Sequence, residues 1–181
     1  MGDLEPSPII LETERLTLRY QRASDVPALV DLWADPQVTR YLGGPRDRLW
    51  LRSEFEETAR DPYAERYDLW PVIERETGHL VGHCGLLDKE VAGRTEIELI
   101  YVLGPSAWGK GYATEMGQAL RQYAFEEMGI RRLIALIEPE NGASERVAVK
   151  IGMRLEKEVV RPGGEVRQVY AVERGDRQAA G

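Results

Sequence analysis

The segment from about residue 95 to residue 139 constrains the fold more than any other part of the chain. It reads as a strand, "TEIELIYVL", the glycine-rich stretch "GPSAWGKGYATE", a helix, and a second apolar strand, "RRLIALIEP". In the helix Tyr112, Met116 and Leu120 recur at intervals of four, which aligns one apolar stripe. Gly129 stands where a glycine just past the C-terminus would end the helix. Two strands joined through a helix are typical of a parallel crossover, so this segment predicts a sheet that is at least partly parallel.

The residues before this segment predict a strand, two helices and an antiparallel meander. "IILETERLTLRY" alternates from about Glu12 and reads as one strand. Ser24-Asp25 supplies an N-cap for a helix that ends at Asp35-Pro36, and a second helix is expected over about 47–60. We expect its apolar residues to face inward, namely Leu49, Leu51 and Phe55. The strand-like segments "YDLWPVIE", "HLVGHCGLLD" and "TEIELIYVL" then form the meander.

After the crossover, "NGASERVAVKIG" predicts a short helix, and "MRLEKEVVR" and "EVRQVYAVE" flank a Pro-Gly-Gly turn as a closing hairpin. The fold class is therefore mixed α/β, with a central sheet of six to seven strands and flanking helices. With 181 residues and 43% hydrophobic content, we expect one domain over 1–181. Its ordered core covers about 8–174, with loose ends at 1–7 and 175–181.

The composition restricts the cellular compartment and the classes of binding partner that we expect. No apolar run approaches the length of a membrane span, and the first residues lack a basic segment followed by an apolar one, so we expect neither a membrane partner nor a secretory signal. The single cysteine, Cys84, suits a reducing cytoplasm. A net charge of −7 argues against a nucleic-acid partner.

The glycine-rich stretch has the spacing of a nucleotide-binding P-loop without its chemistry. Gly109 comes five positions after Gly104 and is followed by Lys110, but Gly111 stands where a P-loop needs Ser or Thr to bind Mg²⁺. The N–H groups at the start of the following helix would still face an anion, and Lys110 adds positive charge. The pattern therefore indicates a phosphate cradle, with a tight turn that binds nothing as the alternative.

The two stretches "IELIYVLGPSAWGKGYATE" and "NGASERVAVKIGM" resemble the GNAT acetyltransferase superfamily. Within it, the chain is similar to the RimJ/RimL-like branch, which acetylates the N-termini of ribosomal proteins, and the likeness extends to "LETERLTLR" and "GHLVGHCGLLD". The family loop is Gln or Arg, two residues, Gly, one residue, then Gly or Ala. Gly109 and Gly111 match this pattern, whereas the first position is Ser106. The resemblance implies that the cradle holds the pyrophosphate of acetyl-CoA and that no metal is needed.

The resemblance also implies which residues bind the cofactor. The strand end is expected to diverge from its neighbour, so that its backbone pairs with the pantetheine arm; ordinary pairing within the sheet is the alternative. Asn141 is expected to reach the pantetheine or an ordered water, although Asn is also among the best N-caps. The implied cofactor-binding residues are Tyr101, Val102, Leu103, Trp108, Gly109, Lys110, Gly111, Tyr112, Ala113, Thr114 and Asn141.

Catalysis requires a base for the acceptor ammonium and a proton for the leaving thiolate. Glu96 and Glu98 lie on one face of a strand, where partial burial would raise a carboxyl pKa. The family pattern favours Glu98, with Glu96 second and a merely solvated strand face as the alternative. Ser144 is the implied proton donor or positioning group, and Asn141 acts beside it; a capping pair is again the alternative.

Two other reactive patterns are rejected. His83 and Cys84 are adjacent in a strand and project to opposite faces, so they cannot form a nucleophile–base pair. His79 and His83 are too far apart along an extended strand to share a metal without a third ligand close by, so no metal site is expected.

The expected function is acetyl-CoA-dependent transfer of an acetyl group directly to a primary amine in a ternary complex. The acceptor is a protein N-terminus or a small-molecule amine, and a homodimer is consistent with the sequence. The alternatives are a non-catalytic acyl-CoA-binding or regulatory module on the same fold, and a P-loop phosphotransferase, which Gly111 disfavours. Aromatic residues could line an acceptor pocket but are more often core: Trp33, Tyr41, Trp50, Trp70 and Tyr170.

Overall fold

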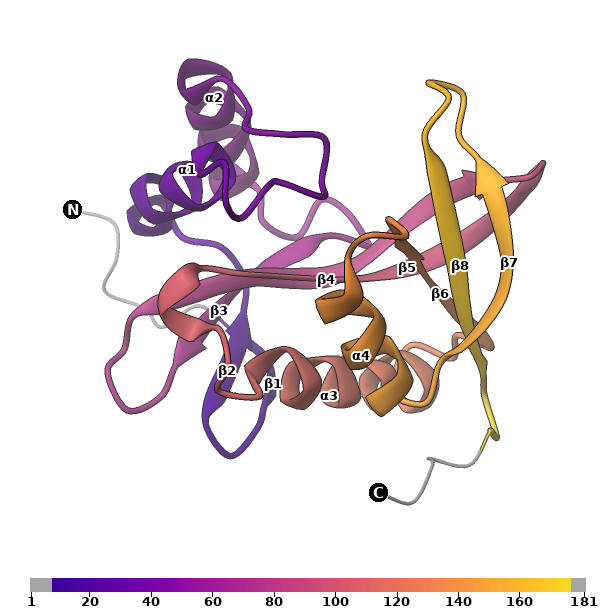
Figure 1. Ribbon diagram of the computed structural model, residues 1–181. Helices are drawn as coiled ribbons and strands as arrows, with labels where there is room; N and C mark the ends of the chain where they lie inside the picture. Colours follow the sequence, from indigo (N-terminus) through magenta and orange to yellow (C-terminus); the bar gives the residue numbers. More distant parts are fainter. Residues whose placement is uncertain (1–7, 177–181) are drawn as a thin grey trace.

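The computed structural model describes residues 8–176, which form one eight-stranded sheet with helices on both faces (Figure 1). The strands are β1 Ile9–Glu12, β2 Leu16–Arg19, β3 Leu69–Glu74, β4 Leu80–Val91, β5 Arg94–Leu103, β6 Arg132–Ile137, β7 Arg154–Val160 and β8 Val166–Glu173. The helices are α1 Val26–Ala34, α2 Arg48–Arg60, α3 Tyr112–Glu126 and α4 Gly142–Lys150. Most of the chain ends expected to be loose, 1–7 and 177–181, lie outside the described residues.

The order of the strands confirms the mixed α/β class with one parallel crossover. The sheet runs β1-β2-β3-β4-β5-β6-β8-β7, and every neighbouring pair is antiparallel except β5 and β6, which α3 connects. The parallel pair is in register only at Glu98 and Ile134. Beyond that point the two strands diverge, which leaves one edge of the C-terminal end of β5 without a strand beside it.

The sheet has eight strands where six to seven are expected, because "IILETERLTLRY" is a hairpin and not one strand. Its turn contains no glycine or proline, and Thr13 takes their place. The Thr13 N–H donates to the Leu16 carbonyl at 2.8 Å, and the Leu16 N–H donates to the Thr13 hydroxyl at 3.0 Å. Side-chain bonds of this kind close a turn without the residues that usually mark one.

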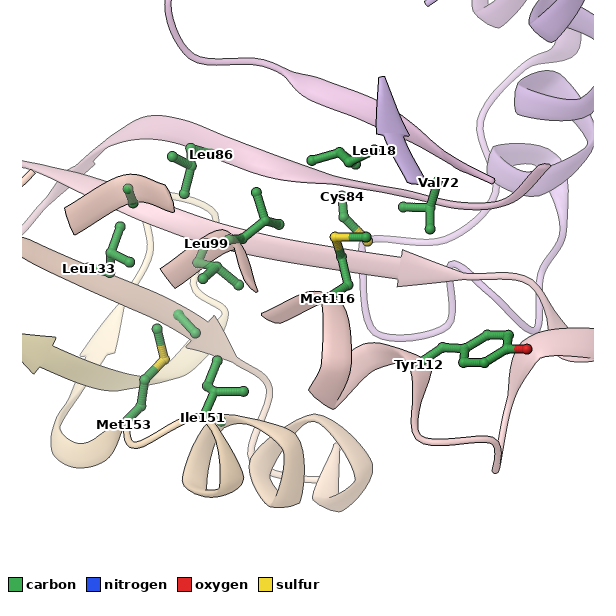
Figure 2. Packing of buried hydrophobic residues seen from close by; sticks show 14 of the residues in the cluster. Leu18, Val72, Cys84, Leu86, Leu99, Tyr112, Met116, Leu133, Ile151 and Met153 are labelled. Carbon is green, nitrogen blue, oxygen red and sulfur yellow. The ribbon is translucent and has the colours of Figure 1, made fainter. Parts of the chain in front are cut away.

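The main core lies between the sheet and the pair α3 and α4, which cover one face (Figure 2). Met116 and Leu120 of α3 and Ile151 just after α4 are fully buried against Leu86 and Leu99 of the sheet. The opposite face carries α1 and α2, which share a smaller cluster of Val26, Val30 and Leu51.

One expected core residue of α2 is exposed. Leu51 is buried, but Leu49 is 78% exposed. Two residues that are two positions apart in a helix are rotated by about 200° around the helix axis, so only one of them can face the core. None of the helices in the described range is long and apolar enough to cross a membrane.

Candidate functional site

An open cavity of about 730 Å³ lies where β5, α3, α4 and the loop after α1 meet. It collects most of the residues that the sequence singles out, although they come from distant parts of the chain. The singled-out residues that line it are Tyr101, Val102, Leu103, Trp108, Gly109, Gly111, Tyr112, Ala113, Thr114, Asn141 and Ser144. Two predicted site residues, Lys110 and Glu98, do not line it.

The start of α3 presents backbone donors to this cavity. Gly109 and Gly111 have φ angles of +72° and +80°, which L-residues with side chains rarely adopt, and Gly111 is the N-cap. The first intrahelical bond runs from the Glu115 N–H to the Gly111 carbonyl at 3.0 Å. The N–H groups before Glu115 have no acceptor within the helix, and the helix dipole adds positive potential at the same place. The geometry suits a phosphate.

The end of β5 forms the adjoining wall. Cys84 and Gly82 of β4 pair with Tyr101 and Leu103 on one edge, while β6 has diverged on the other. The Trp108 indole N–H donates to the Leu103 carbonyl at 2.8 Å, which fixes the glycine loop to the strand. This wall has the unpaired strand edge that an extended ligand with amide groups could pair with.

The start of α4 forms the opposite wall. The Ser144 N–H donates to the Asn141 side-chain oxygen at 3.2 Å, so Asn141 is an N-cap and also lines the cavity. The Tyr101 hydroxyl donates to the Ser144 carbonyl at 2.9 Å and joins the two walls. Burial raises the pKa of Tyr101 above its usual value, so this hydroxyl keeps its proton.

Every charged side chain among the described residues that line the cavity is basic, although the whole chain carries a net charge of −7. Arg146 and Lys150 come from α4, and Arg40 comes from the loop after α1. Cationic side chains beside a helix N-terminus favour an anionic ligand. Sequence reasoning missed these three; the i, i+4 spacing of Arg146 and Lys150 was a usable signal, whereas nothing in the sequence indicates that Arg40 reaches this wall.

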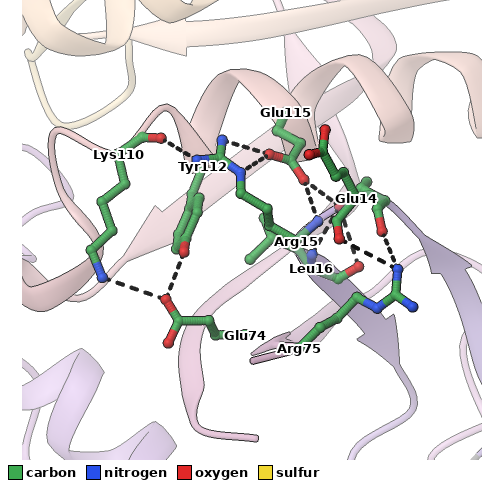
Figure 3. Close-up of polar contacts among 9 residues, drawn as sticks. Glu14, Arg15, Leu16, Glu74, Arg75, Lys110, Tyr112 and Glu115 are labelled. Atoms are coloured by element: carbon green, nitrogen blue, oxygen red, sulfur yellow. Dashed lines mark hydrogen bonds and ion pairs between the residues drawn. The ribbon is translucent and has the colours of Figure 1, made fainter. Parts of the chain in front are cut away.

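The Lys110 side chain lies away from the cavity. Its ammonium is 3.4 Å from the Glu74 carboxylate, which also accepts a hydrogen bond from the Tyr112 hydroxyl at 2.6 Å (Figure 3). The bonds from Tyr112 and Thr77, with the charge of Lys110, lower the pKa of Glu74 to about 2. The loop therefore presents its backbone to the cavity, and the charge of Lys110 serves an ion pair on the other side.

Glu98 lies at the point where β5 and β6 separate. It is 9% exposed, and its carboxylate accepts a bond from the Leu136 N–H at 3.3 Å. Burial raises the pKa of Glu98, an effect that Lys89, Arg161 and Arg167 partly oppose. A carboxylate with a raised pKa is a stronger base than an exposed one, so Glu98 has the electrostatic setting of a general base.

Glu96, on the same face of β5, has different surroundings. The Arg132 guanidinium lies 3.1 Å from its carboxylate and also pairs with Glu156 and Glu173 on the neighbouring strands. The Glu96 carboxylate is therefore held in an ion-pair network, whereas that of Glu98 accepts a backbone N–H. The geometry therefore separates the two carboxylates that sequence alternation leaves equivalent.

His83 and Cys84 occupy opposite faces of the sheet, as alternation requires. The His83 Nδ1 accepts from the Trp33 indole at 3.0 Å, and burial lowers the pKa of His83 to about 4. Burial raises the pKa of the Cys84 thiol to about 12. Across residues 8–176, no group of three or more His, Cys, Asp or Glu side chains is placed to hold a metal.

The aromatic residues considered for an acceptor pocket do not gather in one place. Only Tyr41 lines the cavity. Trp33 is engaged with His83, Trp70 and Tyr170 are buried in the main core, and Trp50 is 52% exposed on α2.

Comparison with known proteins identifies the family. A family model described as an acetyltransferase (GNAT) domain matches residues 15–154. The chain is 32% identical to the uncharacterized N-acetyltransferase p20 of Bacillus licheniformis, over 94% of this chain and 98% of that protein. Among solved structures, a GNAT-family acetyltransferase from Bacillus anthracis superposes with a TM-score of 0.77 at 30% identity, covering 92% of this chain and 98% of that one.

More distant structures share the fold alone. The RimL ribosomal L7/L12 alpha-N-protein acetyltransferase, solved with coenzyme A, is 20% identical with a TM-score of 0.74, over 92% of this chain and 98% of that one. Spermidine N-acetyltransferase from Vibrio cholerae, solved with CoA and spermine, is 15% identical with a TM-score of 0.75, over 91% and 98%. The family match spans well over half of the chain, and the fold and the glycine-loop cavity agree with it: this protein belongs to the GNAT family and is an acetyltransferase.

Proposed function

We propose that the protein uses acetyl-CoA to acetylate a primary amine directly, within a ternary complex. The observation that carries this proposal is the cavity, because it combines a helix N-terminus, an open strand edge and three basic residues, with no acidic side chain among its described lining residues. Coenzyme A has matching parts: a pyrophosphate, an extended arm with two amides, and a further phosphate on its ribose. The RimL and spermidine acetyltransferase structures with CoA support the same ligand for this fold.

In the proposed complex the pyrophosphate lies on the N–H groups at the start of α3. The pantetheine arm lies along the open edge of β5, beside Asn141. Gly109 and Gly111 allow the close approach, while Arg40, Arg146 and Lys150 attract the anionic end. Backbone donors supply the charge stabilisation, so binding needs no metal ion.

The proposed reaction forms a C–N bond and breaks the C–S bond of the thioester. The acceptor must first lose a proton, because most primary amines are protonated at neutral pH. Glu98 takes that proton, directly or through a water. The thiolate of CoA leaves and receives a proton, for which Ser144 on the cavity wall is the candidate donor.

The proposed acceptor is a class of compounds, the primary amines, whereas the proposed cofactor is one compound, acetyl-CoA. The sequence resemblance to the RimJ/RimL-like branch favours a protein N-terminus, and the likeness to a spermidine acetyltransferase favours a polyamine. Both acceptors offer the same reacting group, a primary amine. The aromatic residues considered for an acceptor pocket do not decide between them, since of those five only Tyr41 lines the cavity.

Calorimetry with acetyl-CoA in excess EDTA tests the cofactor, and release of CoA thiol with peptides, polyamines or aminoglycosides tests the transfer. We expect binding without metal and turnover with at least one class of amine. Binding without turnover for any amine would favour the non-catalytic acyl-CoA-binding module. Binding of ATP that requires Mg²⁺, with none of acetyl-CoA, would contradict the proposal.

A further inference from the structure

An arginine from the N-terminal hairpin, Arg15, lies against the glycine loop (Figure 3), and it is not among the residues that line the cavity. The Arg15 guanidinium donates to the backbone carbonyl of Lys110 at 2.9 Å. It is held there by Glu115, whose carboxylate lies 2.7 Å from Nε and 2.6 Å from Nη2. The Tyr112 ring lies beneath it, with the ring centroid 4.6 Å from the guanidinium carbon. Three groups of the loop and helix therefore fix one side chain.

The bond to the Lys110 carbonyl also determines the direction of the next N–H group. A trans peptide is planar, and its C=O and N–H point in opposite directions. The carbonyl of Lys110 and the N–H of Gly111 belong to the same peptide. Because Arg15 holds the carbonyl on the outer side, the Gly111 N–H points to the inner side, where Gly111 lines the cavity.

Arg15 also changes the charge at the start of α3. Glu115 lies in the first turn, where a free carboxylate would repel an anion bound at the helix N-terminus. Its two oxygens are instead engaged by Arg15 and by the Thr13 hydroxyl, which donates at 2.6 Å. The pair is only partly exposed, with Glu115 at 18% and Arg15 at 43% of their side-chain areas, so solvent screens it incompletely.

We infer that Arg15 is a positioning residue for the pyrophosphate site: it orients the Gly111 N–H toward the ligand and neutralises Glu115. The inference rests on the proposed acetyl-CoA function. A guanidinium suits the task because its planar fork can bind a carboxylate and a carbonyl at once, which an ammonium does less well.

The test compares two acetyl donors that differ in the pyrophosphate. Arg15→Ala should weaken CoA binding in calorimetry at least tenfold and raise KM for acetyl-CoA with little change in kcat. With S-acetyl-pantetheine, which lacks the pyrophosphate, its kcat/KM should stay within twofold of the wild type. Arg15→Lys should recover part of the CoA affinity, because it restores charge without the fork.

Arg75→Ala is the matched control. Arg75 braces the same turn from its other side, donating to the Thr13 carbonyl at 2.7 Å, and has no bond to the glycine loop. It should leave CoA affinity unchanged. Wild-type CoA affinity in Arg15→Ala would overturn the inference, as would an equal loss with both donors. Failure of the wild-type protein to bind CoA would instead overturn the proposed function. Thermal melts of each variant exclude unfolding as the cause, and Arg15→Lys replaces Arg15→Ala if the latter does not fold.

Discussion

At the scale of single residues, Glu98 and Glu96 show how surroundings separate two identical side chains. Both are nearly buried on one strand face. Glu98 faces the backbone of β6 through one long hydrogen bond, whereas Glu96 is fixed by Arg132. Burial raises the pKa of Glu98, whereas Glu96 is held in an ion-pair network.

Glu98→Gln should lower kcat/KM for the amine by about 10² to 10⁴, the usual contribution of a general base, and leave CoA affinity unchanged. Burial raises the pKa of Glu98. As the pH is lowered, wild-type activity should therefore begin to fall at a pH above the usual pKa range of carboxyl groups, because Glu98 becomes protonated there. The variant should lack that acidic limb, because glutamine does not titrate. Its side-chain oxygen can still accept from the Leu136 N–H, so the fold should persist.

Glu96→Gln is the control for this prediction. It weakens an ion pair with Arg132 and should reduce stability more than activity. Acetylation rates of both variants, measured from pH 6 to 9, distinguish the two carboxylates. Wild-type activity in Glu98→Gln over that range would refute Glu98 as the base and leave Glu96 or water in its place.

Gly111→Val should weaken acetyl-CoA binding sharply. The φ angle of +80° is unfavourable for a β-branched residue, so the loop would rearrange and misdirect its N–H groups. Gly129→Val places the same strain, at φ +70°, near the far end of α3, about 22 Å away along the helix. Calorimetry should show a large loss of affinity only for Gly111→Val; equal affinities in the two variants would remove the cradle from the proposed site.

At the scale of elements, periodic segments were predictable and turns closed by side chains were not. The meander, the crossover helix, α4 and the closing hairpin follow from apolar spacing and glycine or proline punctuation. The β1–β2 turn was not predicted, because Thr13 closes it in place of a glycine or proline. Asp25 is the N-cap of α1, as expected from Ser24-Asp25, but its side chain makes no capping bond to that helix and pairs with Arg19 at 2.7 Å. Apolar spacing does not indicate side-chain partners of this kind, although both are close in the sequence.

The site was predictable to the same degree. The glycine loop, the strand end and the α4 cap carry local signals, and they meet in one cavity. Arg40 and Arg15 carry none, since each acts on residues far away in the chain. Lys110 was expected at the phosphate because of its position beside two glycines, yet its side chain turns toward Glu74.

The cap of α4 predicts a coupled effect on stability and binding. Asn141→Ala removes the bond to the Ser144 N–H and should cost about 0.5 to 2 kcal/mol of unfolding free energy. The substitution should also weaken the binding of acetyl-CoA, because Asn141 lines the cavity. Asn141→Asp keeps an N-cap acceptor and adds negative charge, so it should fold as well as the wild type yet bind the anionic cofactor less tightly. If both variants bound acetyl-CoA with wild-type affinity, the role of Asn141 would be restricted to capping α4.

At the scale of the whole molecule, one continuous sheet separates two helical layers (Figure 1). Cys84 lies near its middle and is fully buried (Figure 2). Because this is the single cysteine of the chain, its thiol reports on the integrity of the entire core.

Cys84 should not react with an aromatic disulfide reagent in the native protein at neutral pH. Its pKa is raised to about 12 and it has no exposure, so reaction requires opening of the core. Labelling should follow the unfolding transition in urea and slow further when acetyl-CoA is present, since ligand binding stabilises the native state. Rapid labelling of the native protein would show that the sheet opens locally. The same inertness lets released CoA thiol be measured without background from the protein.

The walls of the cavity come from residues 37–42, 101–114 and 141–150, and its outer support comes from Arg15. No single stretch of the chain forms the whole cavity. During synthesis, the hairpin leaves the ribosome about a hundred residues before the helix that it will brace, and α4 follows later still. The complete cavity therefore forms on a nascent chain only after the fourth helix has emerged. A ligand that contacts all three segments can bind only the finished fold.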